Sequence, residues 1–500
     1  MKKKALIVLL ALVLVCATAF SLAACNKKPM ADPDFQVPDG GYDGSEVTIT
    51  FAHTMGTKLQ SVMNNAITKF NEKYPNIKVE PQYKGGYDEV LTQINTALAG
   101  GIEQAPSLAY CYSDHVAVYN LAKAVIKLDN LANSDKTNAD GSLVGFSAEQ
   151  KSDLIENFYN EGKNFEGGGL YQLPVARSTD VLFYNVDFFN EHKTEFDVPT
   201  HWWCTEACPE NCKSSIEFVC KKIKEIDSVS VPFGYDSEAN WFITMCEQLG
   251  SGYTTLDGDN NFIFNNDTNK AFVKKFREWR QKGYITTKIL ENGKYISDLF
   301  KVGAAEGKQK CYMCVGSTGG TSYQLPSDKL FEVGITMMPQ SQFTWETNAE
   351  TGEKEIKFSN PKAISQGPSA CIFNKSNKQE VMAAWLFAKF LATNVEFQAN
   401  YAISNGYIPV IKSVEKDDLY KQWIAKANGK NEFITALGAS VCQKYQNTVF
   451  TSPAFNGSSS ARAEVGKMLA KCLSTKTDNV DELINTAFKD AVNKCIYDQQ

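Results

Sequence analysis

The sequence predicts an α/β protein with a parallel sheet and more than one domain. Residues 46–51 alternate between polar and apolar side chains, which is the period of a strand, and Ile77 and Val79 repeat that alternation. Between them, apolar residues recur with the spacing of one helix face, at positions 59, 62, 63, 66, 67 and 70. A strand, a helix and a strand within about 35 residues form a βαβ unit, which implies a parallel sheet. The 500 residues exceed what one core usually supports, so we expect two domains.

Strands and helices continue to alternate along the chain. We expect helices at 90–98 and 272–279, which end at glycines, and at 381–391, which begins with a capping box of Ser376 and Gln379. Residues 344–356 are polar and predict an inserted, exposed hairpin. Further strands are expected at 108–112, 181–184, 312–315, 333–337 and 370–373.

The N-terminus has the features of an export signal. Three lysines precede an apolar run at 5–20, and small residues then lead to Cys25 in the order Leu-Ala-Ala-Cys. The segment resembles a bacterial lipobox, which implies a signal peptide at 1–24 and diacylation of the Cys25 sulfur; the alternative is an ordinary signal peptide with an incidental cysteine. Residues 25–45 are polar and predict a flexible tether. We therefore expect an extracytoplasmic protein that is lipid-anchored to the cell membrane.

The mature chain is acidic. Removal of residues 1–24 takes away three of the 51 basic residues and none of the 57 acidic ones, which leaves 48 against 57 and a net charge of −9. Such a balance argues against nucleic acid or anionic lipid as the principal partner. After residue 25 no apolar stretch approaches the roughly 18 residues that indicate a spanning helix.

Cysteine is unusually frequent. Of 14 cysteines, Cys16 leaves with the signal peptide and Cys25 is the lipid site, so twelve remain. An even number in an exported chain permits disulfides, although free cysteines also pack as small apolar residues. For the group at 204, 208, 212 and 220, three interpretations stay open: disulfides that fasten an inserted loop, free thiols, or a thiolate metal site. The spacing lacks the paired C-x2-C of common zinc sites, so the sequence assigns neither metal ligands nor a cofactor.

Short stretches of the sequence occur in an order that is typical of one protein family. They begin with FAHTMG at 51–56, FNEKYPNIKV at 70–79 and YKGGY at 83–87. Later ones lie at 173–185, 311–317, 334–339 and 405–409. Together they resemble the family 1 extracellular solute-binding proteins, in particular the glycerol-3-phosphate and sugar-binding branch.

The resemblance implies a two-lobed, periplasmic-binding-protein-like fold with hinge crossovers and a ligand cleft between the lobes. It places the crossovers at 176–178, 365–369 and near 415, so that lobe I comprises 46–176 with 370–415 and lobe II comprises 177–364 with 420–500. The implied protein is a monomeric, non-enzymatic substrate-binding lipoprotein. It would capture a carbohydrate (a sugar, an oligosaccharide or a glycerol phosphate derivative) and deliver it to the transmembrane permease of an ABC importer.

The same resemblance assigns ligand contacts. Some of these residues have an alternative interpretation. Tyr87 could be a surface tyrosine, and Trp241 could be a buried core residue. His53 and Asp114 could be solvated loop residues. Gly367 corresponds to a point where backbone approaches the ligand. The expected ligand-binding residues are Tyr87, Ser178, Trp241, Ser317, Gly367, Tyr407, Asp114 and His53.

One departure from the family pattern bears on the ligand. The branch has a C-terminal arginine that suits a phosphate group, whereas the matching stretch at 452–457 has none and Arg462 is offset. Without a guanidinium that binds through two hydrogen bonds, a phosphoester is disfavoured. Arg177 could supply a positive charge from the other lobe, but we favour a neutral sugar.

Two other classes of function compete with this one. A surface glycoside hydrolase needs two paired carboxylates, and 57 scattered acids give no sign of a pair, while serine-hydrolase, zinc-protease and phosphate-loop motifs are missing. A ligand sensor that docks on a membrane receptor would use the same two lobes, and the sequence does not separate it from an importer component.

Overall fold

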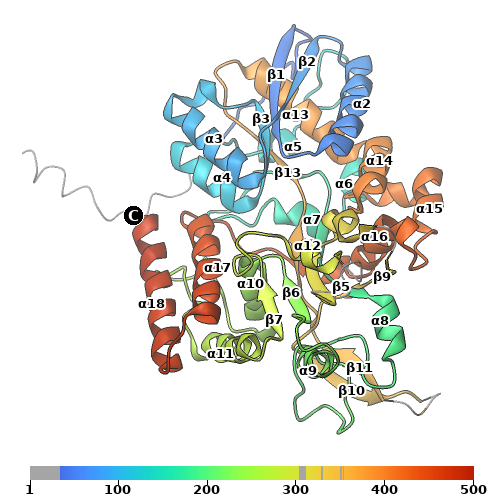
Figure 1. Cartoon of the computed structure of the whole chain (residues 1–500). Coiled ribbons are helices and arrows are strands. Elements are labelled where there is room, and N and C mark those ends of the chain that lie inside the picture. Colours follow the sequence, from blue (N-terminus) through green and yellow to red (C-terminus); the bar gives the residue numbers. More distant parts are fainter. Residues whose placement is uncertain (1–33, 303–310, 328–329, 350–351, 353) are drawn as a thin grey trace, which may run out of the picture.

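The computed structural model describes residues 34–302, 311–327, 330–349, 352 and 354–500. These residues form two α/β lobes, one above the other in Figure 1, and each lobe has its own sheet. This arrangement confirms the predicted α/β class. The expected signal peptide and Cys25 lie outside the described residues.

The sheet of the first lobe has the strand order β2-β1-β3-β13-β4. β1 pairs in parallel with β2 from Val47 opposite Ile77 to His53 opposite Tyr83, which confirms the βαβ unit. β13 runs antiparallel to β3 and β4, so a segment from much later in the chain closes this sheet. The strands are β1 (Val47–His53), β2 (Ile77–Tyr83), β3 (Leu108–Cys111), β4 (Leu173–Pro174) and β13 (Ser369–Ile372).

Helices surround this sheet, and the first of them packs through an apolar face. The first buries Leu59, Met63, Ala66 and Phe70, which follow the predicted period. The helices are α2 (Thr57–Lys73), α3 (Tyr87–Ala99), α4 (Ser113–Tyr119), α5 (Asp129–Ala132), α6 (Ala148–Asp153), α7 (Glu156–Glu161), α13 (Lys378–Thr393), α14 (Val395–Asn405) and α15 (Asp418–Ile424).

The N-cap of helix α13 lies one residue later than predicted. It is Asn377, whose side chain accepts a hydrogen bond of 3.0 Å from the backbone N–H of Gln379. The capping box predicted at Ser376 is therefore wrong, because the adjacent asparagine takes the capping position.

The expected tether ends earlier than residue 45. Phe35 and Tyr42 are buried in the core of the first lobe. The backbone N–H of Tyr42 donates to Asn138 Oδ1 at 2.9 Å, and Asn130 Nδ2 donates to the Phe35 carbonyl at 3.2 Å. Residues from Phe35 onward are thus part of the packed lobe, because two aromatic side chains in this otherwise polar stretch find a place in its core.

The second lobe is built around β5. This strand pairs antiparallel with β8, β9 and β12, while β8, β6 and β7 are parallel neighbours. The strands are β5 (Ser178–Asn185), β6 (Phe233–Tyr235), β7 (Ile285–Thr287), β8 (Met313–Ser317), β9 (Val333–Met337), β12 (Ala363–Gln366) and β14 (Val449–Phe450). The predicted inserted hairpin is present as β10 (Phe343–Thr347) and β11 (Lys354–Phe358).

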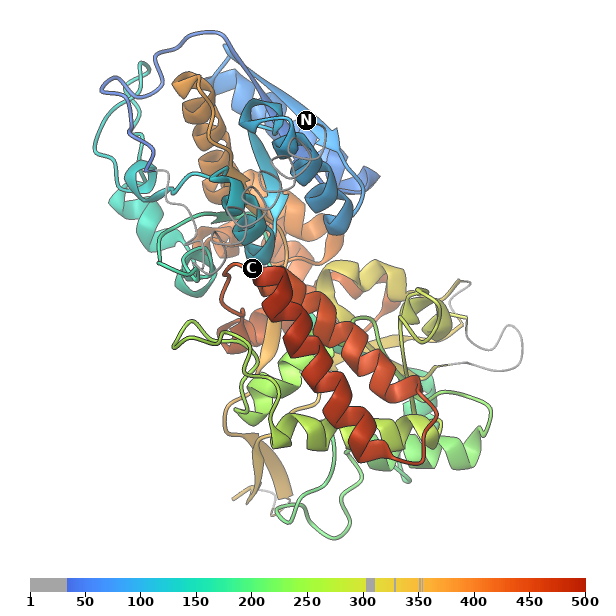
Figure 2. The ribbon, with the colours of Figure 1, turned by 90° about the vertical axis from the view of Figure 1, so that its left-hand side faces the viewer.

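The helices of the second lobe enclose a core rich in aromatic residues, including Trp202, Trp241 and Trp279. Helices α17 and α18 lie side by side along one face (Figure 2). The helices are α8 (Val186–Glu191), α9 (Ile216–Ile226), α10 (Glu238–Leu249), α11 (Asp267–Gln281), α12 (Ile296–Phe300), α16 (Ile434–Lys444), α17 (Ser458–Ser474) and α18 (Val480–Gln499). In the part of the chain that the structure describes, no helix is both long and apolar enough to span a membrane.

The chain passes between the two sheets at residues 175–177, from β4 to β5, and at residues 367–368, from β12 to β13. A third passage follows α15, because Tyr420 of that helix is still buried in the core of the first lobe. It therefore comes later than the expected position near residue 415.

Candidate ligand-binding site

A cavity of about 870 Å³ lies between the two lobes. The carboxyl ends of parallel strands in both sheets point at it: Thr54 follows β1, Tyr112 follows β3, Asp236 follows β6 and Lys288 follows β7. Ligand sites of open α/β sheets form at such strand ends. Gln366 and Pro368, beside the second passage between the lobes, complete the wall.

Tyrosine rings form much of the apolar surface of the cavity. The Tyr87 ring stacks on the Tyr112 ring with centroids 4.1 Å apart and planes inclined by 26°. Tyr407 lies against Gly319, where an added Cβ would come within 2.7 Å of Tyr407 Cζ. Burial raises the pKa of Tyr407 to about 12, so this side chain is a neutral phenol at pH 7.

A buried carboxylate organises the polar wall of the second lobe. Asp180 Oδ2 accepts hydrogen bonds from Tyr235 Oη at 2.8 Å and Asn240 Nδ2 at 3.0 Å, and Asp180 Oδ1 accepts one from Gln366 Nε2. Asn240 Oδ1 in turn accepts from the Arg462 guanidinium. Burial raises the pKa of Asp180, and the three donated hydrogen bonds oppose that shift.

Two further acids of the wall are fixed by backbone. Asp236 Oδ1 accepts from the Ile296 N–H at 2.6 Å, and Glu238 Oε1 accepts from the Ile289 N–H at 2.6 Å. Burial raises the pKa of Asp236 to about 6. These contacts hold the carboxylates in place before any ligand arrives, which reduces the entropy lost on binding.

Three of the expected contact residues line this cavity: Tyr87, Ser317 and Tyr407. Ser178 lies behind them, where its hydroxyl accepts a hydrogen bond of 3.0 Å from Ser317 Oγ. Asp114 lines a smaller cavity of about 80 Å³, which shares Tyr112, Gln366 and Arg462 with the large one.

The other three expected residues are not among those that line the cavity. Trp241 is fully buried, and its ring stacks on Phe276 at 4.2 Å, so it belongs to the core that its alternative interpretation described. His53 is buried too, and its Nδ1 accepts the Met55 N–H at 3.2 Å. Gly367 lies between the wall residues Gln366 and Pro368; its φ is +108°, and a Cβ there would lie 2.5 Å from the Ala176 carbonyl oxygen.

The two arginines have different positions from those the sequence suggested. Arg177 is buried at the first passage between the lobes, where its Nε donates to Glu161 Oε2 at 2.8 Å and its Nη2 donates to Ser369 Oγ at 3.0 Å. It is therefore not free to bind a ligand. Arg462, judged offset from the family position, lies on the wall of both cavities.

Sequence reasoning missed several polar residues of the wall, notably Asp180, Asp236, Asn240 and Gln366. One signal was present: Asp180 directly precedes the apolar run of its strand, and Asp236 comes directly after the residues of another strand. Among the described residues, a group that could hold a metal ion, His201 with three cysteines, lies outside this cavity.

Comparison with known proteins identifies the family. The model of the bacterial extracellular solute-binding proteins matches residues 65–428, which is more than half of the chain. The sn-glycerol-3-phosphate-binding periplasmic protein UgpB of Salmonella typhimurium is 24% identical over 369 residues, which cover 73% of this chain and 74% of that protein. UgpB of Escherichia coli K12 is 23% identical over 372 residues, which cover 73% and 75%.

Solved structures share the fold. UgpB of Mycobacterium tuberculosis, in complex with glycerophosphocholine, has a TM-score of 0.65 at 17% identity and covers 90% of this chain and 98% of its own. A substrate-binding protein of Listeria monocytogenes, in complex with cycloalternan, also has a TM-score of 0.65 at 17% identity and covers 90% of this chain and 98% of its own. The cyclic α-maltosyl-1,6-maltose binding protein of Arthrobacter globiformis has a TM-score of 0.63 at 15% identity, with 90% and 99% covered.

The family match spans parts of both lobes and most of the residues that line the cavity between them, and hydrogen bonds hold the carboxylates of the cavity wall in place. The chain therefore belongs to the bacterial extracellular solute-binding proteins, which bind a solute for an ABC importer.

Proposed function

We propose that the protein captures a carbohydrate, a sugar or an oligosaccharide, between its lobes and delivers it to the transmembrane permease of an ABC importer. The observation that carries the proposal is the inter-lobe cavity of about 870 Å³, whose wall combines tyrosine rings with fixed carboxylate and amide groups. Ring faces cover the C–H surfaces of a sugar, and oriented polar groups bind its hydroxyls. The volume lies in the upper part of the range of about 300–1,000 Å³ for small-molecule sites.

The charges of the wall favour a neutral ligand. Each of the three basic groups already has a partner within the protein: Lys288 Nζ lies 3.8 Å from the centre of the Tyr295 ring, Lys301 pairs with an aspartate at 2.7 Å, and Arg462 donates to Asn240. The ionisable residues of the wall are Asp180, Asp236, Glu238, Asp298, Lys288, Lys301 and Arg462. Acids outnumber bases there, so an anion would be repelled unless it displaced these contacts.

A glycerophosphodiester is the second candidate ligand, and Arg462 is the observation that favours it. This guanidinium lies on the cavity wall, and phosphate is a group that arginine binds well. The UgpB relatives, named for glycerol 3-phosphate or solved with glycerophosphocholine, support the same alternative. The complexes with cycloalternan and the cyclic maltosyl-maltose binding protein support the oligosaccharide.

Binding is proposed to close the lobes about residues 175–177 and 367–368. A ligand that contacts both lobes binds the closed state more tightly, and this difference in affinity drives the closure that a permease recognises. The protein is proposed to act as a monomer without breaking any bond in its ligand. Turnover of an oligosaccharide by the purified protein would instead support the hydrolase, and ligand-dependent binding to a receptor with no uptake would support the sensor.

The mature protein is proposed to be anchored outside the cytoplasm by lipid on Cys25. The lysine-rich start, the apolar run and the Leu-Ala-Ala-Cys order support this proposal. The chain already pairs with the first lobe at Asp34, which forms a β-bridge with Lys127, so residues 26–33 are the proposed tether.

The test is a calorimetric titration of the purified protein with maltose, maltotriose, cyclic oligosaccharides and glycerophosphocholine. We expect binding of at least one neutral sugar, and we expect Tyr407→Ala to lower its affinity by at least about tenfold, or 1.4 kcal/mol. The melting temperature of the empty variant should stay close to that of the wild type. Binding of glycerophosphocholine alone, abolished by Arg462→Gln, would select the second candidate.

A further inference from the structure

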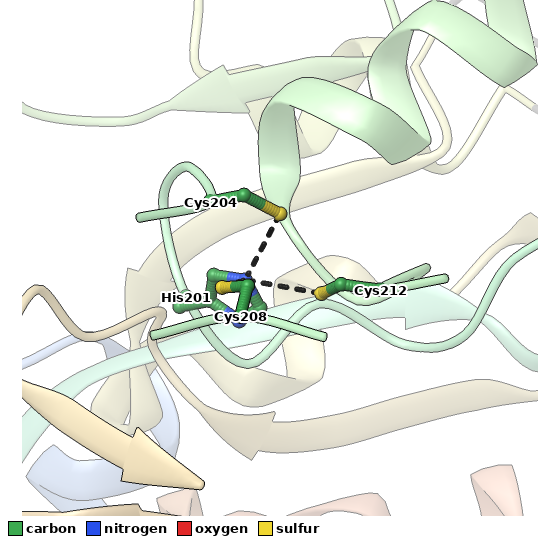
Figure 3. A group of neighbouring side chains, drawn as sticks. All are labelled: His201, Cys204, Cys208 and Cys212. Carbon is green, nitrogen blue, oxygen red and sulfur yellow. Dashed lines mark hydrogen bonds between the residues drawn. The ribbon is translucent and has the colours of Figure 1, made fainter. Parts of the chain in front are cut away.

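Four side chains of the types that ligate metal ions converge in a loop of the second lobe, between α8 and α9 (Figure 3). His201 Nε2 lies 3.8 Å from Cys204 Sγ, 3.7 Å from Cys208 Sγ and 3.5 Å from Cys212 Sγ. All four donor atoms lie within 4.8 Å of one another. We propose that these residues bind one Zn²⁺ ion through three thiolates and one imidazole.

The distances fit one tetrahedral ion. With Zn–S distances of about 2.3 Å and Zn–N distances of about 2.0–2.1 Å, a tetrahedral site places sulfur and nitrogen donors about 3.5 Å apart and two sulfurs about 3.8 Å apart. The three observed sulfur-to-nitrogen distances, 3.5–3.8 Å, lie at this edge length. Soft thiolates with imidazole select zinc over calcium or magnesium, which prefer oxygen ligands.

The histidine is oriented as a ligand. His201 Nδ1 lies 3.0 Å from Thr200 Oγ1, and the Thr200 hydroxyl donates to Ser214 Oγ at 3.5 Å. Because the hydroxyl hydrogen is used for Ser214, Nδ1–H donates to Thr200 and the lone pair of Nε2 faces the sulfurs. Ligating histidines in proteins are usually held by such a hydrogen bond on the other ring nitrogen.

The histidine is also held by its surroundings. It is fully buried, its backbone carbonyl accepts from the Ile216 N–H at 2.9 Å, and its ring packs on Phe343 of β10 at 4.6 Å. A rigid nitrogen ligand therefore stands at the base of the loop, next to the inserted hairpin.

Packing does not explain the cysteines of this loop. Of the twelve cysteines in the described chain, all are buried except Cys204, which is exposed, and Cys208, which is half-buried. Residues 203–213 form turns without a helix or strand, and the backbone N–H groups of Cys208 and Cys212 each close a turn, with Thr205 and Pro209. An ion that crosslinks a loop with so little regular structure adds most to the stability of that loop.

The sequence pattern had grouped these cysteines with Cys220 instead of His201. Cys220 lies on α9 and is buried in the apolar core of the lobe. The ligand pattern is therefore H-x2-C-x3-C-x3-C, and this assignment replaces the earlier expectation of no metal ligand. Three cysteines cannot all pair with one another, so a disulfide between two of them would leave the third thiol unpaired.

The proposed ion has a structural role. None of its ligands lines the inter-lobe cavity, and Figure 1 shows α9, β10 and β11 at the end of the second lobe that points away from the first. The ion would fasten the loop to the base of the hairpin. This inference does not depend on the ligand of the cavity.

Zinc analysis of the purified full chain tests the proposal. After dialysis against Zn²⁺ and removal of the excess, we expect one zinc per chain in the wild type and in Cys220→Ala, and less than a fifth of that in His201→Asn and in Cys208→Ser. Far-UV circular dichroism checks that each variant is folded. Chelation should lower the melting temperature of the wild type and leave that of Cys208→Ser unchanged.

Cobalt provides a readout that needs no variant. Co²⁺ added to the zinc-free wild type should give the intense visible and thiolate charge-transfer absorption of a tetrahedral thiolate site, and Zn²⁺ should abolish it. Absence of these bands, full zinc content in both ligand variants, or a disulfide joining two of the three cysteines in freshly purified protein would each overturn the proposal.

Discussion

Arg177 Nε donates to Glu161 Oε2 at 2.8 Å, and the two side chains are only 3% and 8% exposed. The same guanidinium donates to the carbonyls of Ala176 and Pro368, so it joins two of the segments that pass between the lobes. A charged residue that the sequence offered to the ligand thus binds the hinge segments to each other.

Arg177→Ala should lower the free energy of unfolding by about 3–5 kcal/mol, because it leaves the Glu161 carboxylate buried without a partner. Urea denaturation of the empty protein measures the loss. Lys274→Ala breaks an exposed pair with Asp481 and should leave the stability nearly unchanged, because solvent screens such a pair. Equal effects of the two substitutions would show that the hinge pair contributes no more than a surface pair.

Gly319→Ala should weaken ligand binding at least about tenfold, because the new Cβ would displace the Tyr407 ring from the cavity wall. Gly320→Ala is the matched control, since its Cβ would meet only Tyr323 Cδ2 at an ordinary 3.8 Å. Calorimetry with the sugar that the wild type binds measures both affinities. If Gly319→Ala binds the sugar with unchanged affinity, Tyr407 does not contribute to ligand binding.

Trp241→Ala should destabilise the empty protein by about 3–5 kcal/mol, the usual loss for a large aromatic side chain of the core. Tyr87→Ala should leave the melting temperature nearly unchanged and lower ligand affinity, because Tyr87 lies on the cavity wall. Thermal unfolding without ligand separates the two roles. If Trp241→Ala is stable but no longer binds the ligand, Trp241 contacts the ligand and is not a core residue.

Acid should weaken the fold through His53. Burial lowers the pKa of His53 to about 4, whereas an unfolded histidine titrates near 6.5. Between these values the unfolded chain takes up a proton that the folded chain does not, so stability falls as the pH falls from about 6.5 to about 4 and falls no further through this group below that.

The variant His53→Asn isolates this effect, because an asparagine oxygen can accept the Met55 N–H in place of Nδ1. The stability of the wild type relative to this variant should fall by up to about 3 kcal/mol across the pH window. Urea denaturation at several pH values measures the difference. A difference that does not change with pH would mean that His53 titrates alike in both states.

Cys25→Ser should release the protein from the membrane into the soluble extracellular fraction, because no sulfur remains for the lipid. Fractionation of cells that express each form, with immunoblotting, measures the distribution. Cys16→Ser is the control and should stay in the membrane fraction. Retention of Cys25→Ser there would refute the lipid anchor.

The elements that could be predicted are those with a clear local period. The βαβ unit of β1, α2 and β2 is an example, because its buried residues recur at positions 2 or 3.6 residues apart. Strands of two residues, such as β4 and β14, contain too few residues to show a period. Helix α10 is buried on nearly all sides, so its pattern did not reveal which way Trp241 points.

The sites were harder because they join residues that are far apart in the chain. Asp180 meets Gln366 and Asn240 only after the lobe has folded, and Arg462 reaches them from α17. Tyr87 and Tyr407 were identified from family motifs and not from hydrophobic periodicity or residue chemistry. The group of cysteines was visible in the sequence, but His201 was not assigned to it. Only the fold shows that Cys220 lies in the core and that His201 takes its place beside the other three cysteines.

The most direct test of the central claim is small-angle X-ray scattering during titration with the sugar that calorimetry identifies. The account predicts that the radius of gyration falls as the cavity fills, in step with the calorimetric saturation, and that Tyr407→Ala needs correspondingly more ligand for the same change. Saturated binding with an unchanged scattering profile, or no binding of any carbohydrate or glycerophosphodiester, would contradict it.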